Sequence, residues 1–398
     1  MKKILSVFGT RPEAIKMAPL VKVLDLTPGI ESLVCVTGQH RQMLDQVMQL
    51  FQIRADFDLA VMQPNQSLNG LFTRAMSGVD EVIANVRPDV VLVHGDTSTA
   101  CACALAAFHR RTPVGHVEAG LRTGNLSMPF PEEMNRRTVD GVSEWMFAPT
   151  LTSKANLLRE NLQGRIHVTG NTVIDALAST CDTLQKDAVL GARMRADYPW
   201  IDPERKLILV TGHRRESFGD GFRSICAALA ELSVRRDVQI VYPVHLNPAV
   251  RNVVMSSLGQ CDRIHLIEPL DYLDFVWMMQ RAHIILTDSG GVQEEAPYLG
   301  KPVLVMRDVT ERPEAVAAGT VTIVGTRTER IHAAVTRLLD DAHYHASFAR
   351  RINPYGDGKA SQRIVAALLG RSFREFGAGV DESPSIPSAH AVPMQSGG

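Results

Sequence analysis

The sequence contains no long hydrophobic run. None of its segments approaches the roughly 18 consecutive apolar residues of a membrane-spanning helix. The apolar segment after Met1 is short and continues directly into the polar segment Gly9–Glu13, so it does not have the form of a signal peptide. We therefore expect a cytoplasmic protein with no membrane partner.

The sequence also lacks an excess of either charge and has no clustered cysteines. Its 42 basic and 43 acidic side chains give a net charge of −1, which argues against a main role in binding nucleic acid or an anionic membrane. The six cysteines form no CxxC pair, as expected for reduced thiols in the cytosol. Any phosphate ligand must therefore be bound by local groups.

The segment IILTDSGGVQEEAPYLGKPVLV, residues 284–305, has the pattern of strand, tight turn, helix and strand. It predicts a buried strand at Ile284–Thr287 and a helix from near Val292 to Gly300. The turn Ser289-Gly290-Gly291 lets a ligand approach the backbone, and the free N–H groups of a helix start bind phosphate. Glu295 suits a ribose diol. The alternative is that the acids of this segment only favour the helix start electrostatically.

Apolar strands alternate with amphipathic helices along most of the chain, which predicts parallel sheets covered by helices on both faces. Segment Asp182–Arg205 interrupts this rhythm, so we predict two similar α/β domains, over residues 1–170 and 171–358. Residues 371–398 are rich in Ser, Pro, Gly and Ala and are predicted to be a disordered tail. The predicted strands are 4–8, 33–37, 90–94, 113–117, 144–148 and 166–169, then 207–211, 238–243, 264–267, 284–287, 302–306 and 321–324.

Polar side chains follow several of these strands, at the sheet edge where parallel α/β folds bind ligands. Three acids in one domain, opposite basic groups and a phosphate-type helix start in the other, indicate a phosphate-bearing sugar or nucleotide and acid–base chemistry. The first turn lacks a GxGxxG fingerprint, which weakens a dinucleotide interpretation. The polar residues are Arg11, Lys16, Asp96, Glu118 and Glu132 in the first domain and His213, Arg214, Arg215 and His245 in the second.

Some of these residues also have a purely structural interpretation, in which they take no part in catalysis or binding. Asp96 precedes Thr97 and could be a helix N-cap. An isolated histidine such as His245 is more often a hydrogen-bonded structural residue. Glu133, beside Glu132, is expected to be a solvated surface charge.

Eleven ordered motifs then identify a resemblance that spans residues 3–370. They are FGTRPEAIKMAP, TGQHRQMLD, VLVHGDT, GHVEAGLRTGN, PEEMNR, HVTGNTVID, HRRES, YPVHLNP, LTDSGGVQEEAP, TERPEA and NPYGDG. Together they resemble the non-hydrolysing UDP-N-acetylglucosamine 2-epimerases. The resemblance implies a glycosyltransferase-B type fold, in which two Rossmann-like domains face each other across a cleft and a C-terminal helix, here about 359–370, returns to the first domain. It also implies a cytosolic homodimer that needs neither a metal nor a nicotinamide cofactor.

The family reaction interconverts UDP-GlcNAc and UDP-ManNAc, which supplies ManNAc units for surface polysaccharides. It is thought to eliminate UDP to give 2-acetamidoglucal and to add UDP back. By motif, the resemblance implies that Asp96, Glu118, Glu132 and His213 are catalytic. It implies that the substrate is bound by Arg11, Lys16, His213, Phe275, Ser289, Gly290, Gly291, Glu295 and Arg312. Which acid removes the C2 proton stays open.

Some bacterial members of the family bind a second UDP-GlcNAc as an activator. The positions that match this second site are Gln39, Gln42, Glu132, Arg214 and His245. The loop 62–67, however, has no arginine where such members place one. Activation by substrate is therefore left open.

Three other functions remain as alternatives. A hydrolysing epimerase would release UDP and free ManNAc, so retention of the nucleotide in the product discriminates. A glycosyltransferase on the same fold would need an acceptor. A non-enzymatic nucleotide-sugar sensor would not need a cluster of acids.

Overall fold

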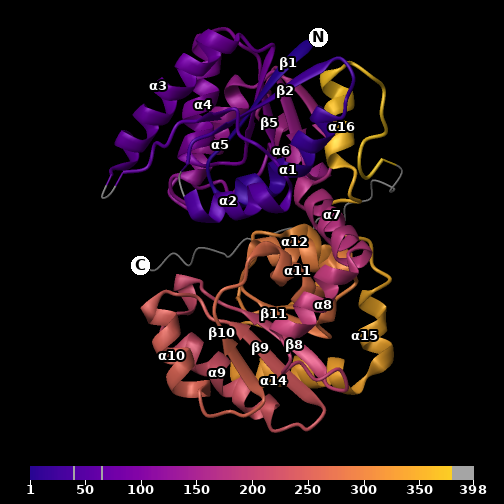
Figure 1. Ribbon diagram of the computed structural model, residues 1–398. Coiled ribbons are helices and arrows are strands. Elements are labelled where there is room, and N and C mark those ends of the chain that lie inside the picture. The colour runs from indigo at the N-terminus through magenta and orange to yellow at the C-terminus, as the bar shows by residue number, and fades with distance from the viewer. Residues whose placement is uncertain (39–40, 64–65, 379–398) are drawn as a thin grey trace, which may run out of the picture.

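The computed structural model describes residues 1–38, 41–63 and 66–378, and these form two lobes (Figure 1). Each lobe contains one parallel β-sheet. The strands of both sheets are buried between helices, as their continuous apolar sequences require. In the described part of the chain, no helix has both the length and the apolar composition to cross a membrane.

The N-terminal lobe has a seven-stranded sheet in the order β3-β2-β1-β4-β5-β6-β7. The order reverses between β1 and β4, so their carboxyl ends mark the switch point where such sheets bind ligands. Its strands are β1 Lys2–Phe8, β2 Ile30–Val36, β3 Phe57–Asp58, β4 Val90–His94, β5 Val114–Val117, β6 Trp145–Ala148 and β7 Arg165–Val168. Its helices are α1 Arg11–Asp25, α2 Arg41–Leu50, α3 Leu68–Val86, α4 Ser98–His109, α5 Glu132–Val142 and α6 Leu151–Arg159.

The C-terminal lobe has a six-stranded sheet in the order β10-β9-β8-β11-β12-β13. Here the switch point lies between β8 and β11. Its strands are β8 Lys206–Thr211, β9 Val238–Pro243, β10 Ile264–Ile267, β11 Ile284–Thr287, β12 Val303–Val305 and β13 Val321–Ile323. Its helices are α9 Asp220–Ser233, α10 Pro248–Leu258, α11 Tyr272–Arg281, α12 Gly290–Glu295, α13 Pro313–Ala317, α14 Thr328–Asp340 and α15 Ala342–Phe348.

Two consecutive helices, α7 Thr172–Lys186 and α8 Ala188–Asp197, join the lobes. The end of α7 and all of α8 lie in the segment Asp182–Arg205, where the strand–helix rhythm of the sequence stops. Helix α7 contacts α1 of the N-terminal lobe and both α11 and α12 of the C-terminal lobe. The chain thus passes between the lobes through a helix that is packed against both (Figure 1).

The chain returns to the N-terminal lobe at its C-terminal end. Helix α16, Ala360–Leu368, packs against α1 and α7, as Figure 1 shows on its upper right. Residues 371–378, which the sequence places in the tail, also contact this lobe. The Phe376 N–H donates to the Val168 carbonyl at the edge of β7, and Glu375 pairs with Lys154 at 2.8 Å. The remainder of the expected tail, residues 379–398, lies outside the described residues.

The two-domain α/β fold with parallel sheets is confirmed, and its strands lie where the sequence predicts them, apart from β3. That strand has only two residues and follows a polar loop, so it has no periodic signal. The helix predicted from Val292 to Gly300 begins two residues earlier, at Gly290. It becomes a 3₁₀ turn after Glu295, because Pro297 cannot donate an N–H.

Candidate functional site

Two arginines lie beside the start of α12. A Cβ atom at Gly290 would lie 3.5 Å from Nη2 of Arg312 and 3.9 Å from Nη2 of Arg214, so glycine leaves this space open. The helix start supplies backbone N–H groups, and the two guanidinium groups supply positive charge. This arrangement can bind a phosphate or a diphosphate.

His213 is held beside this helix start by the buried Asp288, which follows β11. One carboxylate oxygen of Asp288 accepts the backbone N–H groups of His213 and Arg214 at 2.7 and 2.8 Å. The other lies 3.3 Å from Nδ1 of His213. Burial opposes the charge of Asp288, but the His213 ring and the two amides lower its pKa below the usual value. Asp288 therefore fixes the turn that carries His213.

Glu295 lies one turn into α12 and is buried. Its Oε1 accepts a hydrogen bond of 2.7 Å from the hydroxyl of Tyr272. Burial raises its pKa to about 7, although Tyr272, Lys16 and Arg11 favour the charged form. Phe275 is half-buried on α11, three residues after Tyr272.

Glu118 is held by its backbone and by two basic side chains in the N-terminal lobe. It has a left-handed backbone conformation, with φ of +70°, and its Oε2 lies 2.5 Å from Nζ of Lys16 and 3.7 Å from Nε2 of His94. Burial opposes its charge, but Lys16 and His94 outweigh burial and hold its pKa well below the usual range. A non-glycine residue in this conformation is strained, and such strain is typical of functional sites.

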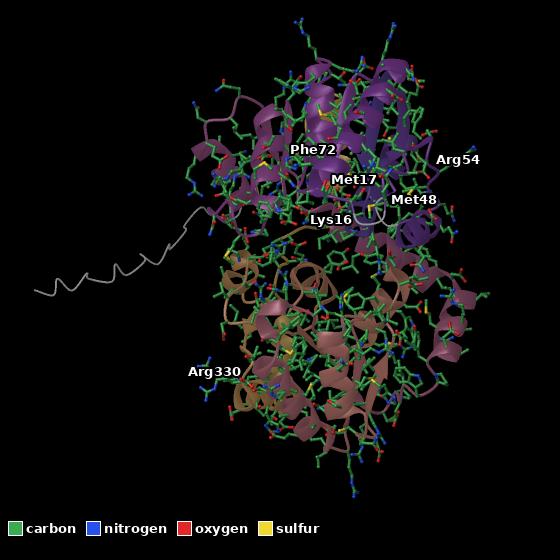
Figure 2. All side chains as sticks on the ribbon, turned by 90° about the vertical axis from the view of Figure 1, so that its left-hand side faces the viewer. Lys16, Met17, Met48, Arg54, Phe72 and Arg330 are labelled. Carbon is green, nitrogen blue, oxygen red and sulfur yellow. The ribbon has the colours of Figure 1, made fainter. Side chains whose placement is uncertain are left out.

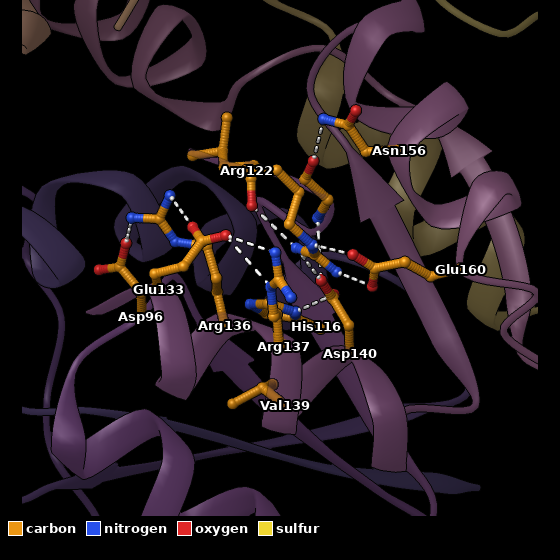
Figure 3. Close-up of polar contacts among 12 residues, drawn as sticks. Asp96, His116, Arg122, Glu133, Arg136, Arg137, Val139, Asp140, Asn156 and Glu160 are labelled. Atoms are coloured by element: carbon orange, nitrogen blue, oxygen red, sulfur yellow. Dashed lines mark hydrogen bonds and ion pairs between the residues drawn. The ribbon is translucent and has the colours of Figure 1, made fainter. Parts of the chain in front are cut away.

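Asp96 follows β4 and pairs with Arg136, whose Nη2 lies 2.5 Å from its Oδ2 (Figure 3). Asp96 is not a helix N-cap, because the hydroxyl of Thr97 occupies that role for α4. Glu132 is the first residue of α5 and is half-buried. The Glu132 carboxylate forms no hydrogen bond or ion pair with any other described residue, so it is available to a ligand.

Glu133 is fully buried, so the expectation of a solvated surface charge is wrong. Its carboxylate accepts the N–H groups of Thr123 and Gly124 at 3.0 and 3.1 Å and also pairs with Arg137. It therefore anchors the long loop between β5 and α5. The adjacent acids Glu132 and Glu133 look alike in sequence, but they point to different surroundings.

A chain of polar contacts joins the two lobes. The side-chain amide of Asn171 donates to Glu118 at 2.8 Å and to Glu294 at 3.2 Å. Glu294 in turn accepts from Nε of Arg312 at 2.5 Å. Lys16, which begins this chain, is labelled at the junction of the lobes in Figure 2. Glu118 of the N-terminal lobe is thus linked to Arg312 of the C-terminal lobe through the Asn171 amide and Glu294.

A cavity of about 300 Å³ lies between the lobes. The Arg11 side chain lines it and donates to the Leu270 carbonyl of the opposite lobe at 3.2 Å. Tyr272 lines the cavity from the other side, and its ring packs against Phe51 with the centroids 6.3 Å apart. The two lobes are therefore in contact at this cavity.

The structure brings most of the predicted site residues to the facing surfaces of the lobes. His245 is exposed and stacks on His213, with the ring centroids 5.4 Å apart, so this pair lies beside the helix start of α12. Gln39 and the side chain of Gln42, which the resemblance places in a second ligand site, lie outside the described residues. In the described part of the chain, no group of three or more His, Cys, Asp or Glu side chains could hold a metal ion.

Sequence reasoning did not find several side chains that complete the site. His94 and Asn171 contact Glu118, Tyr272 contacts Glu295, and Arg136 contacts Asp96. Asn171 could have been predicted as a site residue, because it is a polar residue that comes shortly after β7, as Asp96 comes shortly after β4. The others lie inside a strand or a helix, where the sequence does not mark them.

Comparison with known proteins agrees with this geometry. The family model described as UDP-N-acetylglucosamine 2-epimerase matches residues 22–369. A UDP-N-acetylglucosamine 2-epimerase of Escherichia coli K12 is 58% identical over 368 residues, which cover 92% of this chain and 98% of the relative.

Solved structures agree as well. The Neisseria meningitidis UDP-GlcNAc 2-epimerase bound to UDP-GlcNAc has a TM-score of 0.86 at 51% identity and covers 93% of this chain and 100% of its own. The Methanocaldococcus jannaschii enzyme in complex with UDP-GlcNAc and UDP has a TM-score of 0.77 at 33% identity, covering 92% and 99%.

Proposed function

Because this chain belongs to the UDP-N-acetylglucosamine 2-epimerase family, we propose that it interconverts UDP-GlcNAc and UDP-ManNAc without hydrolysis. One observation carries this proposal. Three carboxylates, of Asp96, Glu118 and Glu132, belong to the lobe opposite a helix start flanked by Arg214 and Arg312. A nucleotide diphosphate at that helix start would direct its sugar toward the acids.

The nucleotide half of the substrate binds the C-terminal lobe. The diphosphate lies at the turn Ser289–Gly291, where the N–H groups of Gly290 and Gly291 point to it, with Arg312 and His213 beside it. Glu295 accepts hydrogen bonds from the ribose hydroxyls, and Phe275 contacts the uracil. Arg11 and Lys16 reach the same region from the N-terminal lobe, so both lobes contribute to binding.

The reaction begins with elimination. The C1–O bond breaks and its electron pair leaves with UDP, whose new charge is stabilised by the arginines and the helix start. A carboxylate removes the C2 proton, which gives 2-acetamidoglucal. The proton then returns to the other face of C2 while the UDP oxygen adds again at C1. Atoms balance without water, a metal or a hydride carrier.

The contacts of the three acids suggest different roles. Glu118 is held as a carboxylate by Lys16, so it can stabilise positive charge on the sugar ring as UDP leaves. Asp96 and Glu132 are the candidates for moving the C2 proton. The product would serve as a donor of ManNAc units in polysaccharide synthesis, and the functional form is proposed to be a homodimer.

Incubation of UDP-GlcNAc with the enzyme in D₂O, followed by NMR, tests this function. We expect UDP-ManNAc that carries deuterium at C2, because the abstracted proton exchanges with solvent before it returns. Slow release of free UDP and 2-acetamidoglucal should accompany it. The amide variants D96N, E118Q and E132Q provide the comparison. Replacement of the acid that returns the proton should raise the release of glycal relative to epimerisation.

Two results would contradict the proposal. An epimer that contains no deuterium and forms without glycal would exclude the elimination route. Free ManNAc with UDP and no nucleotide-bound epimer would instead identify a hydrolysing enzyme.

A further inference from the structure

Helix α5 has an unusual distribution of charge. Its sequence, EEMNRRTVDGV, is strongly polar, yet Glu133, Asn135, Arg136 and Asp140 are buried. Buried ion pairs contribute little to stability compared with apolar residues of the same size, because desolvation costs about as much as the attraction returns. The buried charges of α5 therefore call for another explanation, and their partners supply it.

The partners of α5 are the segments that carry the acids of the proposed site (Figure 3). Arg136 binds the carboxylate of Asp96, and Nδ2 of Asn135 donates to the Asp96 carbonyl at 2.8 Å. Asp140 accepts the N–H of Gly120, two residues after Glu118, at 3.2 Å. One helix thus contacts the side chain and backbone of Asp96 and the loop of Glu118, and it begins with Glu132.

Arg136 is itself fixed by its surroundings. Its side chain is only 11% exposed, and its Nη1 lies 3.4 Å from Oε2 of Glu133, which is fully buried. Glu133 is held by two backbone N–H groups of the loop after Glu118. The guanidinium therefore lies between two carboxylates, and its planar geometry determines the direction in which Asp96 points.

We propose that Arg136 is a positioning residue for Asp96, that Glu133 fixes Arg136 in turn, and that this relay sets the angle at which Asp96 meets the sugar. This inference rests on the proposed function, because it assigns Asp96 to the chemistry. A displacement of a reacting group by about 1 Å can lower a rate about 100-fold. Loss of Arg136 should therefore affect turnover more than binding.

The next residue provides a matched control. Arg137 also pairs with Glu133, at 3.1 Å, but it is 38% exposed and has no contact with Asp96. R136Q should lower kcat about 100-fold with little change in KM for UDP-GlcNAc, whereas R137Q should stay within about threefold of the wild type, as expected for a partly exposed ion pair. R136K, which keeps the charge but loses the planar fork, should recover only part of kcat.

A double-mutant cycle separates positioning from a general effect on the fold. If Arg136 acts through Asp96, adding R136Q to D96N should cost less than about threefold in residual activity, because the group it positions is already absent. Thermal midpoints and UDP affinities of all variants show whether each protein is folded. R136K replaces R136Q in the cycle if R136Q does not fold.

The outcomes are distinct. Equal losses in R136Q and R137Q, or additive losses in the double mutant, would overturn the positioning role while the wild type remains an epimerase. A wild-type enzyme that yields no UDP-ManNAc would instead overturn the proposed function on which the inference rests.

Discussion

Glu295 combines burial with a proposed role, ribose binding, that favours a charged carboxylate. The residue is 6% exposed, and its carboxyl group has a pKa of about 7 because burial penalises the ionised form. The charged groups that face it are Arg11 and Lys16 of the N-terminal lobe and Glu294 on its own helix, with Tyr272 on α11. Near neutral pH the free protein is therefore expected to hold this proton about half of the time.

We expect the affinity for UDP to rise with pH through about 7. The carboxylate offers both oxygens as acceptors to the ribose diol, whereas protonation turns one of them into a donor. Binding at pH 6 should therefore be up to about tenfold weaker than at pH 8 on account of Glu295 alone. The phosphate of UDP also titrates near pH 6. E295Q removes the first effect and keeps the second. Calorimetry at several pH values on both proteins isolates the contribution of Glu295, and identical pH profiles would contradict its ribose role.

The same carboxyl group should make the free protein less stable at higher pH. Its folded pKa of about 7 lies above the ordinary value of 4.5, so the folded state holds the proton more tightly than the unfolded chain. The resulting stability is complete below about pH 4.5 and is lost as the pH rises to about 7. E295Q should therefore unfold at a higher temperature than the wild type at pH 8, and a lower midpoint would contradict the assignment.

At the scale of one element, α5 shows how a polar helix can be held in a protein interior. His116 is fully buried, and its Nδ1 lies 2.6 Å from Oδ1 of Asp140, while its Nε2 lies 2.8 Å from the Gly95 carbonyl. Arg122 reaches Oδ2 of Asp140 at 2.8 Å and continues to Glu160 at the surface. Burial opposes the charge of Asp140, but His116 and Arg122 lower its pKa.

We expect D140N to lower the free energy of unfolding by about 3–5 kcal/mol, because it leaves a buried arginine and histidine without their carboxylate. E160Q is the control at the outer end of the same chain of charges. Glu160 is 31% exposed, so its loss should cost less than about 1 kcal/mol. Urea denaturation of both variants measures the difference, and equal costs would show that the Asp140 contacts contribute no more than a surface pair.

Elements with a clear apolar period were predictable, and so were their strand-end residues. Strands β4, β9, β10 and β11 lie at the residues predicted from their apolar runs. Glu133 and Arg136 were not predictable, because a run of charges has the same sequence pattern on a surface as around a buried acid. Their burial depends on Asp96 and on the loop after Glu118, which are distant in sequence and meet α5 only in the folded lobe.

At the scale of the whole molecule, Asn171 connects the two lobes. Its Oδ1 accepts the N–H of Val173 at the start of α7, so its amide hydrogens must point to Glu118 and Glu294. N171D would keep the helix cap but place a third carboxylate between the two. N171S keeps a cap and removes the donors without adding charge.

We expect N171D to be less stable than N171S by on the order of 4 kcal/mol at pH 8, because of repulsion between like charges at close range. The difference should shrink toward pH 5, where one of the crowded carboxyl groups can take up a proton. Thermal or urea unfolding of both variants across this range provides the measurement. A difference that does not depend on pH would mean that the amide acts only as a cap.

The return of the chain to its first lobe has a consequence for biosynthesis. The surface of α1 and α7 that α16 covers stays exposed until α16 has been made. The Val168 carbonyl at the edge of β7 likewise has no N–H donor from Phe376 until that residue has been made. Nascent chains usually fold domain by domain from the N-terminus. Here the ribosome must translate the entire C-terminal lobe before the first lobe can be completed. A ribosome stalled before residue 360 would therefore hold an N-terminal lobe with an exposed apolar surface, which chaperones can bind.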